Sequence, residues 1–209
     1  MNRITILVTT LALTLTAAAC KGKEGAGGSS GGGGAAKTTE TAAKAAPPTL
    51  AINDADWVEK DLSTVSPMVH VKMRVPKDAK LEKNGNGGVD VLIADFYMLT
   101  VGANAVSNIA EAIKDQKSMT IESTSWINGK VVTEEPNGLI YSVQMKTEEN
   151  GTTYQPETHF IFVVEKEGAI YTIHDEKPLS SSLELPGSTW NEDLAKKVYA
   201  IVKASAKAS

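Results

Sequence analysis

The sequence predicts an α+β domain in which helices pack on an antiparallel β-sheet, and three observations support this class. Apolar and polar residues alternate over residues 68–75, as in a strand with one buried face. Short strand-like runs separated by Gly- and Asn-containing turns follow one another between residues 119 and 174. An amphipathic helix closes the chain after Thr189. Strands and helices grouped in this way are typical of an antiparallel meander covered by helices.

The domain is predicted to begin with a short helix and a strand. Asn53 or Asp54 can cap a helix that runs to Leu62, and Ser66-Pro67 ends it. The strand that follows places four apolar residues on one face and three polar residues on the other. The apolar face is Val69, Val71, Met73 and Val75, and the polar face is His70, Lys72 and Arg74.

A turn, an apolar run and a second helix are predicted next. Residues 84–88 form a Gly- and Asn-rich turn, and Val89–Val101 is a long apolar run rich in β-forming residues. Asn104 is the expected cap of a helix with apolar residues at helical spacing. That stripe consists of Val106, Ile109, Ala110 and Ile113.

The strand series between residues 119 and 174 is divided by turn signals. Met119–Ile127 leads to Asn128-Gly129, the strongest short hairpin signal. Further turns are expected at residues 136–138, 149–151 and 165–168. The strands between them are predicted at Lys130–Glu134, Leu139–Lys146, His159–Val164 and Ala169–His174. The run His159–Val164 is apolar on both faces, which predicts a central strand covered on both sides.

The final helix is predicted from a capping box at Thr189-Trp190-Asn191-Glu192. Its apolar stripe is Leu194, Val198, Ile201 and Val202. The order of these elements, the VKMRVP strand and the closing helix resemble the PsbP-type fold over about residues 57–207. The resemblance implies helices on an antiparallel sheet and carries no functional residue over.

The first 19 residues are predicted to be a cleaved signal peptide. Arg3 precedes an apolar core of twelve residues, Ile4–Leu15, which spans roughly 18 Å and is short for a transmembrane helix. Small residues follow, and then Cys20, the one cysteine of the chain. This arrangement resembles the lipobox of bacterial lipoproteins, although Ala17 stands where Leu is usual.

The resemblance implies a diacylglyceryl anchor at Cys20, and Lys21 after it implies the outer membrane rather than the inner one. No second cysteine is available for a structural disulfide, and a free thiol is a liability in an oxidising compartment. Two alternatives remain open at this point. One is an ordinary secretory signal cut after Ala19, and the other is a signal anchor that stays in the membrane.

Residues 20–49 are predicted to be a lipidated cysteine followed by a disordered tether. Residues 21–49 include eight Gly and seven Ala and no Val, Leu, Ile, Met or aromatic residue. Such a segment has little apolar surface to offset the entropy of ordering. The globular domain is therefore assigned to residues 50–209. Residues 1–49 carry a net charge of +3 and the chain carries −4, so the domain carries −7. This charge disfavours nucleic-acid binding.

The histidines offer weak evidence for a metal or catalytic site. His70 is expected on a solvated strand face, and His159 is expected to make a local hydrogen bond at a strand end. His174-Asp175-Glu176 has the residue types of a metal site, but neighbours on a strand point to opposite faces. No metal or cofactor is therefore predicted.

Other chemistry-bearing residues have simpler interpretations. Ser180-Ser181-Ser182 lacks a nucleophile elbow and reads as a loop, and Glu134-Glu135 is expected to face solvent. The strand aromatics are expected to lie mainly in the core, although some could line a ligand cleft. They are Trp126, Tyr141, Phe160, Phe162 and Tyr171.

Three functions are compatible with these features. The favoured hypothesis is a non-enzymatic binding or assembly module, tethered to the envelope by lipid and with a possible protein partner there. The alternatives are an envelope hydrolase whose site is dispersed in sequence and a purely structural surface lipoprotein. The sequence predicts no catalytic residue.

Overall fold

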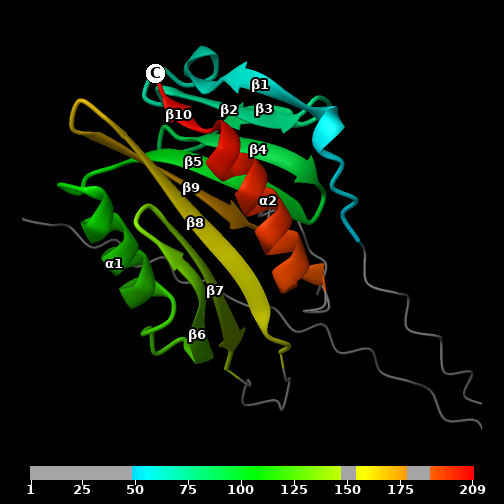
Figure 1. Ribbon diagram of the computed structural model, residues 1–209, viewed down its shortest axis with the longest axis vertical. Coiled ribbons are helices and arrows are strands. Elements are labelled where there is room, and N and C mark those ends of the chain that lie inside the picture. The colour runs from blue at the N-terminus through cyan, green and yellow to red at the C-terminus, as the bar shows by residue number, and fades with distance from the viewer. Residues whose placement is uncertain (1–48, 147–153, 178–188) are drawn as a thin grey trace, which may run out of the picture. The chain divides into compact units, whose positions relative to one another are not determined.

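The computed structural model describes residues 49–146, 154–177 and 189–209 of the chain (Figure 1). These residues form two α-helices and antiparallel strands in two sheets, so the α+β class expected from the sequence is confirmed. Neither helix in these ranges is long and apolar enough to cross a membrane. Cys20, the turn predicted at residues 149–151 and Ser180-Ser181-Ser182 lie outside the described residues.

The larger sheet has seven strands, and its strand order joins two runs that are far apart in the sequence. In spatial order the strands are β3 (Lys80–Lys83), β4 (Val89–Ala94), β5 (Tyr97–Asn104), β9 (Ala169–Glu176), β8 (Glu157–Lys166), β7 (Gly138–Met145) and β6 (Trp126–Glu135). The long run predicted at residues 89–101 is in fact two strands, because the chain turns at Asp95-Phe96. The predicted meander is present as β6-β7-β8-β9, and its last strand, β9, pairs with β5 of the earlier run.

The smaller sheet contains the segment for which the predicted helix is wrong. Its strands are β1 (Trp57–Asp61), β2 (Val71–Pro76) and β10 (Lys207–Ala208). Short 3₁₀ turns flank β1, namely η1 (Asp54–Asp56), which Asn53 caps, and η2 (Leu62–Thr64). All five residues of β1 pair with β2, and this ladder outweighs the weak propensity of so short a helix. The alternation predicted for β2 is confirmed, because Val69, Val71, Met73 and Val75 are buried.

Helix α1 (Ile109–Met119) covers one face of β7 and β8. Its buried residues Ala112 and Ile113 belong to one apolar cluster with Leu139, Ile161 and Val163. The helix begins later than predicted, because its cap is Asn108, whose side chain accepts a hydrogen bond from the Glu111 N–H at 2.9 Å. Asn104, the predicted cap, is the last residue of β5.

Helix α2 (Glu192–Ser205) covers the opposite face of β8, as the alternation of that strand requires (Figure 1). The predicted stripe of Leu194, Val198, Ile201 and Val202 is buried. It packs with Phe160 and Phe162, while Ile161 and Val163 face α1. The prediction that this strand is covered on both sides is confirmed. The cap of α2 is Asn191 rather than Thr189.

A glycine, a tyrosine and a glutamate join α2 to the turn between β6 and β7. A Cβ added to Gly138 would lie 1.9 Å from the Tyr199 Oη atom, so a glycine is required at this position. The Tyr199 hydroxyl donates to Glu135 Oε2 at 2.8 Å, and Lys203 Nζ lies 2.7 Å from Glu135 Oε1. The turn predicted at residues 136–138 is confirmed.

The hairpin predicted at Asn128-Gly129 is wrong, because strand β6 continues through both residues. The register against β7 shifts between Ile127 and Lys130, and Asn128 has a φ of 55°. Asn128 Nδ2 donates to Gln144 Oε1 on the neighbouring strand at 2.7 Å. The Asn-Gly pair therefore forms a bulge within the strand, which needs the same left-handed backbone as a turn.

Candidate functional site

Strands β8 and β9 separate at one end of the larger sheet, and polar side chains occupy the gap. Their ladder runs from Lys166 and Ala169 to Ile161 and His174. Beyond that pair β9 stays with β5 and β8 stays with β7. The Phe160 N–H donates to Asp175 Oδ1 at 2.9 Å, so in the gap a main-chain N–H of β8 is bound by a side-chain carboxylate of β9. Residues that are distant in the sequence are brought together here.

Aromatic rings pack around this gap. Trp190, which precedes α2, is buried, and its carbonyl accepts a hydrogen bond from the Thr158 N–H of β8 at 2.7 Å. The Trp190 ring centroid lies 4.9 Å from that of His159 and 4.8 Å from that of Tyr97. Among the described residues, Trp190 Nε1 and Thr189 Oγ1 have no hydrogen-bond partner. The Thr189 hydroxyl thus does not serve as the predicted helix cap.

His159 lies between two carboxylates that come from different strands. Its Nε2 atom is 3.4 Å from Glu157 Oε2, and its Nδ1 atom is 3.5 Å from Asp175 Oδ1. Lys177 Nζ binds the other oxygen of Glu157, and the Tyr97 hydroxyl donates to Asp175 Oδ2 at 3.3 Å. The Asp175 side chain is 1% exposed, and that of His159 is 12% exposed. The local hydrogen bond predicted for His159 is present, and it belongs to a larger charged cluster.

The electrostatics of this cluster favour a charged histidine. Burial lowers the pKa of His159, but the charges and hydrogen bonds of Asp175 and Glu157 outweigh it and raise the pKa to about 9. Burial raises the pKa of Glu157, but hydrogen bonds from His159 and Lys177 bring it below its usual value. Burial and the Asp175 charge raise the pKa of Tyr97 well above its ordinary value. His159 is therefore a cation at neutral pH.

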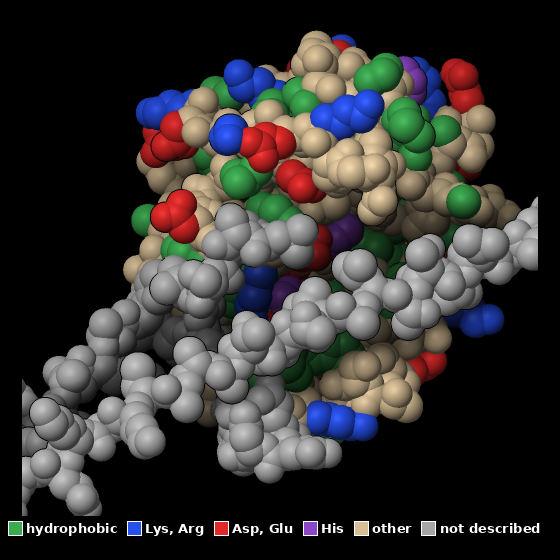
Figure 2. Space-filling model, turned by 180° about the vertical axis from the view of Figure 1, so that it is seen from behind, with side chains coloured by type: hydrophobic (Ala, Val, Ile, Leu, Met, Phe, Trp, Pro, Cys, Tyr) green, Lys and Arg blue, Asp and Glu red, His purple; other side chains and the backbone are tan. Residues whose placement is uncertain are grey.

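A pocket of about 340 Å³ opens beside this cluster, near the end of α1. Its two walls differ in character. One wall comes from α1, β6 and β7 and consists of Thr120, Trp126, Tyr141, Val143 and Met145, and the other comes from β8 and β9 and consists of Glu157, His159, His174, Asp175, Glu176 and Lys177. Figure 2 shows histidine, acidic and basic side chains beside hydrophobic ones in a hollow of this side of the molecule. Apolar side chains beside a few polar groups are typical of small-molecule sites.

The predicted candidates divide between this pocket and the rest of the surface. His70 is exposed, as expected. His174 and Glu176 share one face of β9, with His174 Nε2 3.7 Å from Glu176 Oε2, while Asp175 is buried. Phe160, Phe162, Tyr171 and Tyr141 lie in the apolar core as predicted, and Tyr141 also lines the pocket together with the partly buried Trp126. Sequence reasoning missed Glu157 and Lys177. Glu157 lies two residues before His159 on β8, and Lys177 lies two residues after Asp175, just beyond the end of β9.

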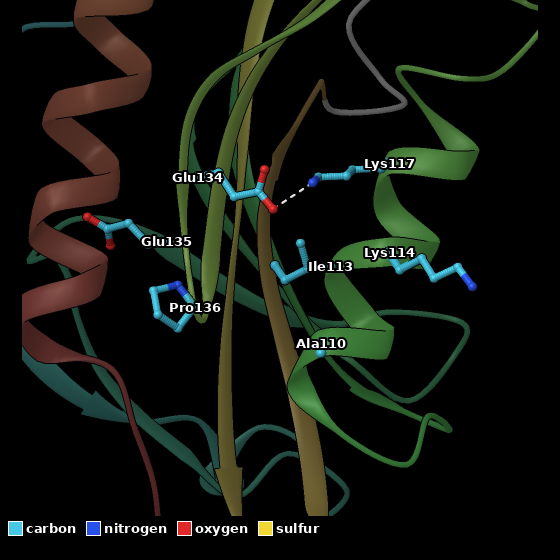
Figure 3. A pocket seen from close by; sticks show the side chains of 7 residues that line it. All are labelled: Ala110, Ile113, Lys114, Lys117, Glu134, Glu135 and Pro136. Carbon is cyan, nitrogen blue, oxygen red and sulfur yellow. Dashed lines mark hydrogen bonds and ion pairs between the residues drawn. The ribbon is translucent and has the colours of Figure 1, made fainter.

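A second cavity, of about 540 Å³, lies between α1 and the turn that joins β6 and β7 (Figure 3). Lys117 Nζ pairs with Glu134 Oε1 across it at 2.6 Å, while Lys114 points away from it. Glu134 is exposed as predicted, but Glu135 is partly buried and bound to Tyr199 and Lys203. The Lys117–Glu134 pair joins α1 to β6, and Glu135 joins the end of β6 to α2.

Comparisons with known proteins place the chain in no family. No family model matches it, and no curated protein and no solved structure is significantly similar to it. Within the described ranges, no group of three or more His, Cys, Asp or Glu side chains is arranged to hold a metal ion. The geometry of the pocket is therefore the basis for a functional proposal.

Proposed function

We propose that this protein is a lipid-anchored, non-enzymatic binding module of the cell envelope that holds a ligand in the pocket beside His159. The observation that carries this proposal is the pairing of an apolar wall with a charged wall in one pocket. At about 340 Å³, the volume lies in the usual range of roughly 300–1,000 Å³ for ligand sites. Hydrogen bonds and ion pairs within the protein fix the positions of Glu157, His159 and Asp175 without a ligand. Such preorganisation favours specific binding.

The anchor and the location belong to the same proposal and rest on the sequence. A diacylglyceryl group on Cys20 would hold the chain at a bacterial membrane, and Lys21 favours the outer one. The domain carries a net charge of −7, so anionic lipid headgroups would not attract it and the acyl chains would supply the attachment. A protein partner in the envelope and a PsbP-like arrangement of the domain are further parts of this proposal.

The chemistry of the pocket supports binding over catalysis. A general base at neutral pH must be unprotonated, whereas His159 has a pKa of about 9. The hydroxyl groups that line the pocket in the described residues are those of Thr120 and Tyr141. Thr120 donates to the Gln116 carbonyl at 2.6 Å, and Gln116 Nε2 donates to the Tyr141 hydroxyl at 3.0 Å. Neither hydroxyl contacts a histidine that could activate it as a nucleophile.

An envelope hydrolase is the alternative, and one observation favours it. His159 Nδ1 lies 3.5 Å from the buried Asp175, and carboxylates orient catalytic histidines in this way. A panel of ester, amide and glycoside substrates tests this alternative on the full chain. Turnover that is lost in both His159→Gln and His174→Ala would support the hydrolase and contradict the binding module.

Retention of a native compound tests the binding module. The full chain is purified from native membranes, and bound small molecules are extracted and compared by mass spectrometry. Met145→Trp fills the pocket from a side chain that is 43% exposed, so it should abolish retention without unfolding the domain. Val58→Trp, at an exposed position on β1, is the matched control and should retain the compound. Equal retention by both variants would contradict ligand binding in this pocket.

A further inference from the structure

The carboxylates of the charged wall of the pocket differ in whether a basic side chain pairs with them. Glu157 binds Lys177, and His159 lies between Glu157 and Asp175, so two cations serve these two carboxylates. Within the described residues, Glu176 is 3.7 Å from a His174 ring nitrogen and 3.4 Å from the Thr100 hydroxyl, and it pairs with no lysine or arginine. Among the described residues, histidines and a hydroxyl group rather than a lysine or arginine thus stabilise the Glu176 carboxylate.

Glu176 is also placed to meet a ligand. Its side chain is 50% exposed, whereas that of Asp175 is 1% exposed. The hydrogen bond from His174 lowers the pKa of Glu176 despite partial burial, so the group is ionised at neutral pH. A ligand that enters the pocket therefore encounters a carboxylate that no lysine or arginine of the described residues neutralises.

The apolar wall of the pocket suits the hydrocarbon part of an organic cation. Trp126 and Met145 are partly exposed in the pocket lining, and Tyr141 and Val143, which also line it, are buried. Aromatic faces attract ammonium and guanidinium groups, and they also cover alkyl or aryl chains. The domain charge of −7 adds a long-range field that favours the approach of cations.

We propose that the ligand of this pocket is an organic cation, with an amine or guanidinium group at Glu176 and an apolar or aromatic body against Trp126 and Met145. This inference rests on the proposed function, because it names the ligand class of that same pocket. An anionic ligand would instead have to draw Lys177 or His159 away from Glu157, to which both are bound. A neutral ligand would leave Glu176 without an ammonium or guanidinium partner among the described residues.

Three probes with the same aromatic body and different charge test the inference. They are 2-phenylethylamine, 2-phenylethanol and 3-phenylpropionate, each titrated into the full chain at neutral pH and followed by NMR of the tryptophan indole signals. Trp126→Phe assigns the signal of the pocket. The amine should bind roughly tenfold more tightly than the alcohol, and the anion should bind most weakly.

Two charge-neutralising variants separate a local effect from the field of the domain. Glu176→Gln should weaken amine binding roughly fivefold or more and leave the alcohol unchanged. Glu59→Gln removes the same charge from an exposed position on β1 and should leave both affinities unchanged. The inference is overturned if the anion or alcohol binds as tightly as the amine, if none of the probes binds, or if both variants behave alike. A native compound that is retained but anionic would overturn it while leaving the proposed function intact.

Discussion

At the scale of single residues, His159 is a group whose charge depends on the fold. It is one of three histidines in the chain, and two carboxylates and a tryptophan ring surround it. The sequence placed it at the start of a central strand with a hydrogen-bond partner. The sequence could not identify Asp175 as that partner. The Asp175 carboxylate reaches the His159 ring only because the β8–β9 ladder ends nearby, and no local pattern shows where this ladder ends.

The raised pKa of His159 predicts a stability that falls with increasing pH. A pKa of about 9 in the folded state lies above the ordinary 6.5, so the stabilisation is complete below the lower value. It is lost as the pH rises through the higher one, and the loss should be roughly 3 kcal/mol. Urea unfolding of the parent near both ends of this window measures it.

Two histidine variants make this prediction specific. His159→Gln should flatten the dependence of unfolding free energy on pH across the window. His70→Gln changes an exposed histidine of the same chain and should keep the parental dependence. Parallel curves for the parent and His159→Gln would show that the histidine is not stabilised as a cation.

At the scale of elements, the apolar periodicity of α2 and β2 was a correct guide, whereas the local signals at Asn128-Gly129 and Asn104 were misleading. The stripe of α2 and the alternation of β2 reflect burial, which the sequence encodes directly. Asn128-Gly129 is a local signal for left-handed backbone, and a bulge satisfies it as well as a hairpin does. The same limit applies to Asn104, since Asn108 also has the chemistry of a cap and pairing with β9 extends β5 to residue 104.

Helix α2 should contribute measurably to stability through its buried face. Val198 and Ile201 are buried against the sheet, so Ile201→Ala should cost roughly 2–4 kcal/mol through lost burial and the cavity that remains. Lys197→Ala, on the exposed face of the same helix, should change the free energy by less than about 0.5 kcal/mol. Urea melts of the two variants give the comparison. Equal midpoints would mean that the helix is not docked on β8.

At the scale of the whole molecule, the candidate site depends on a strand order that no local pattern reveals. Glu157 and Lys177 lie on β8 and just after β9, and they meet because β9 lies between β5 and β8. The sequence predicted that strands would alternate with turns here, but many strand orders share that pattern. The sequence therefore showed which charged residues the domain contains, but it did not show that these residues meet around one pocket.

The proposed attachment to a membrane is tested at this scale by Cys20→Ser. If the thiol carries the lipid, the variant should appear in the soluble periplasmic fraction or accumulate as an uncleaved precursor, because its domain carries −7 and is not drawn to anionic headgroups. Cell fractionation with mass measurement of the N-terminal peptide distinguishes these outcomes. Lys21→Asp is the matched variant for location, and it should keep the lipid but move the protein towards the inner membrane. A Cys20→Ser protein that is cleaved and still sediments with membranes as the parent does would mean that another contact anchors it.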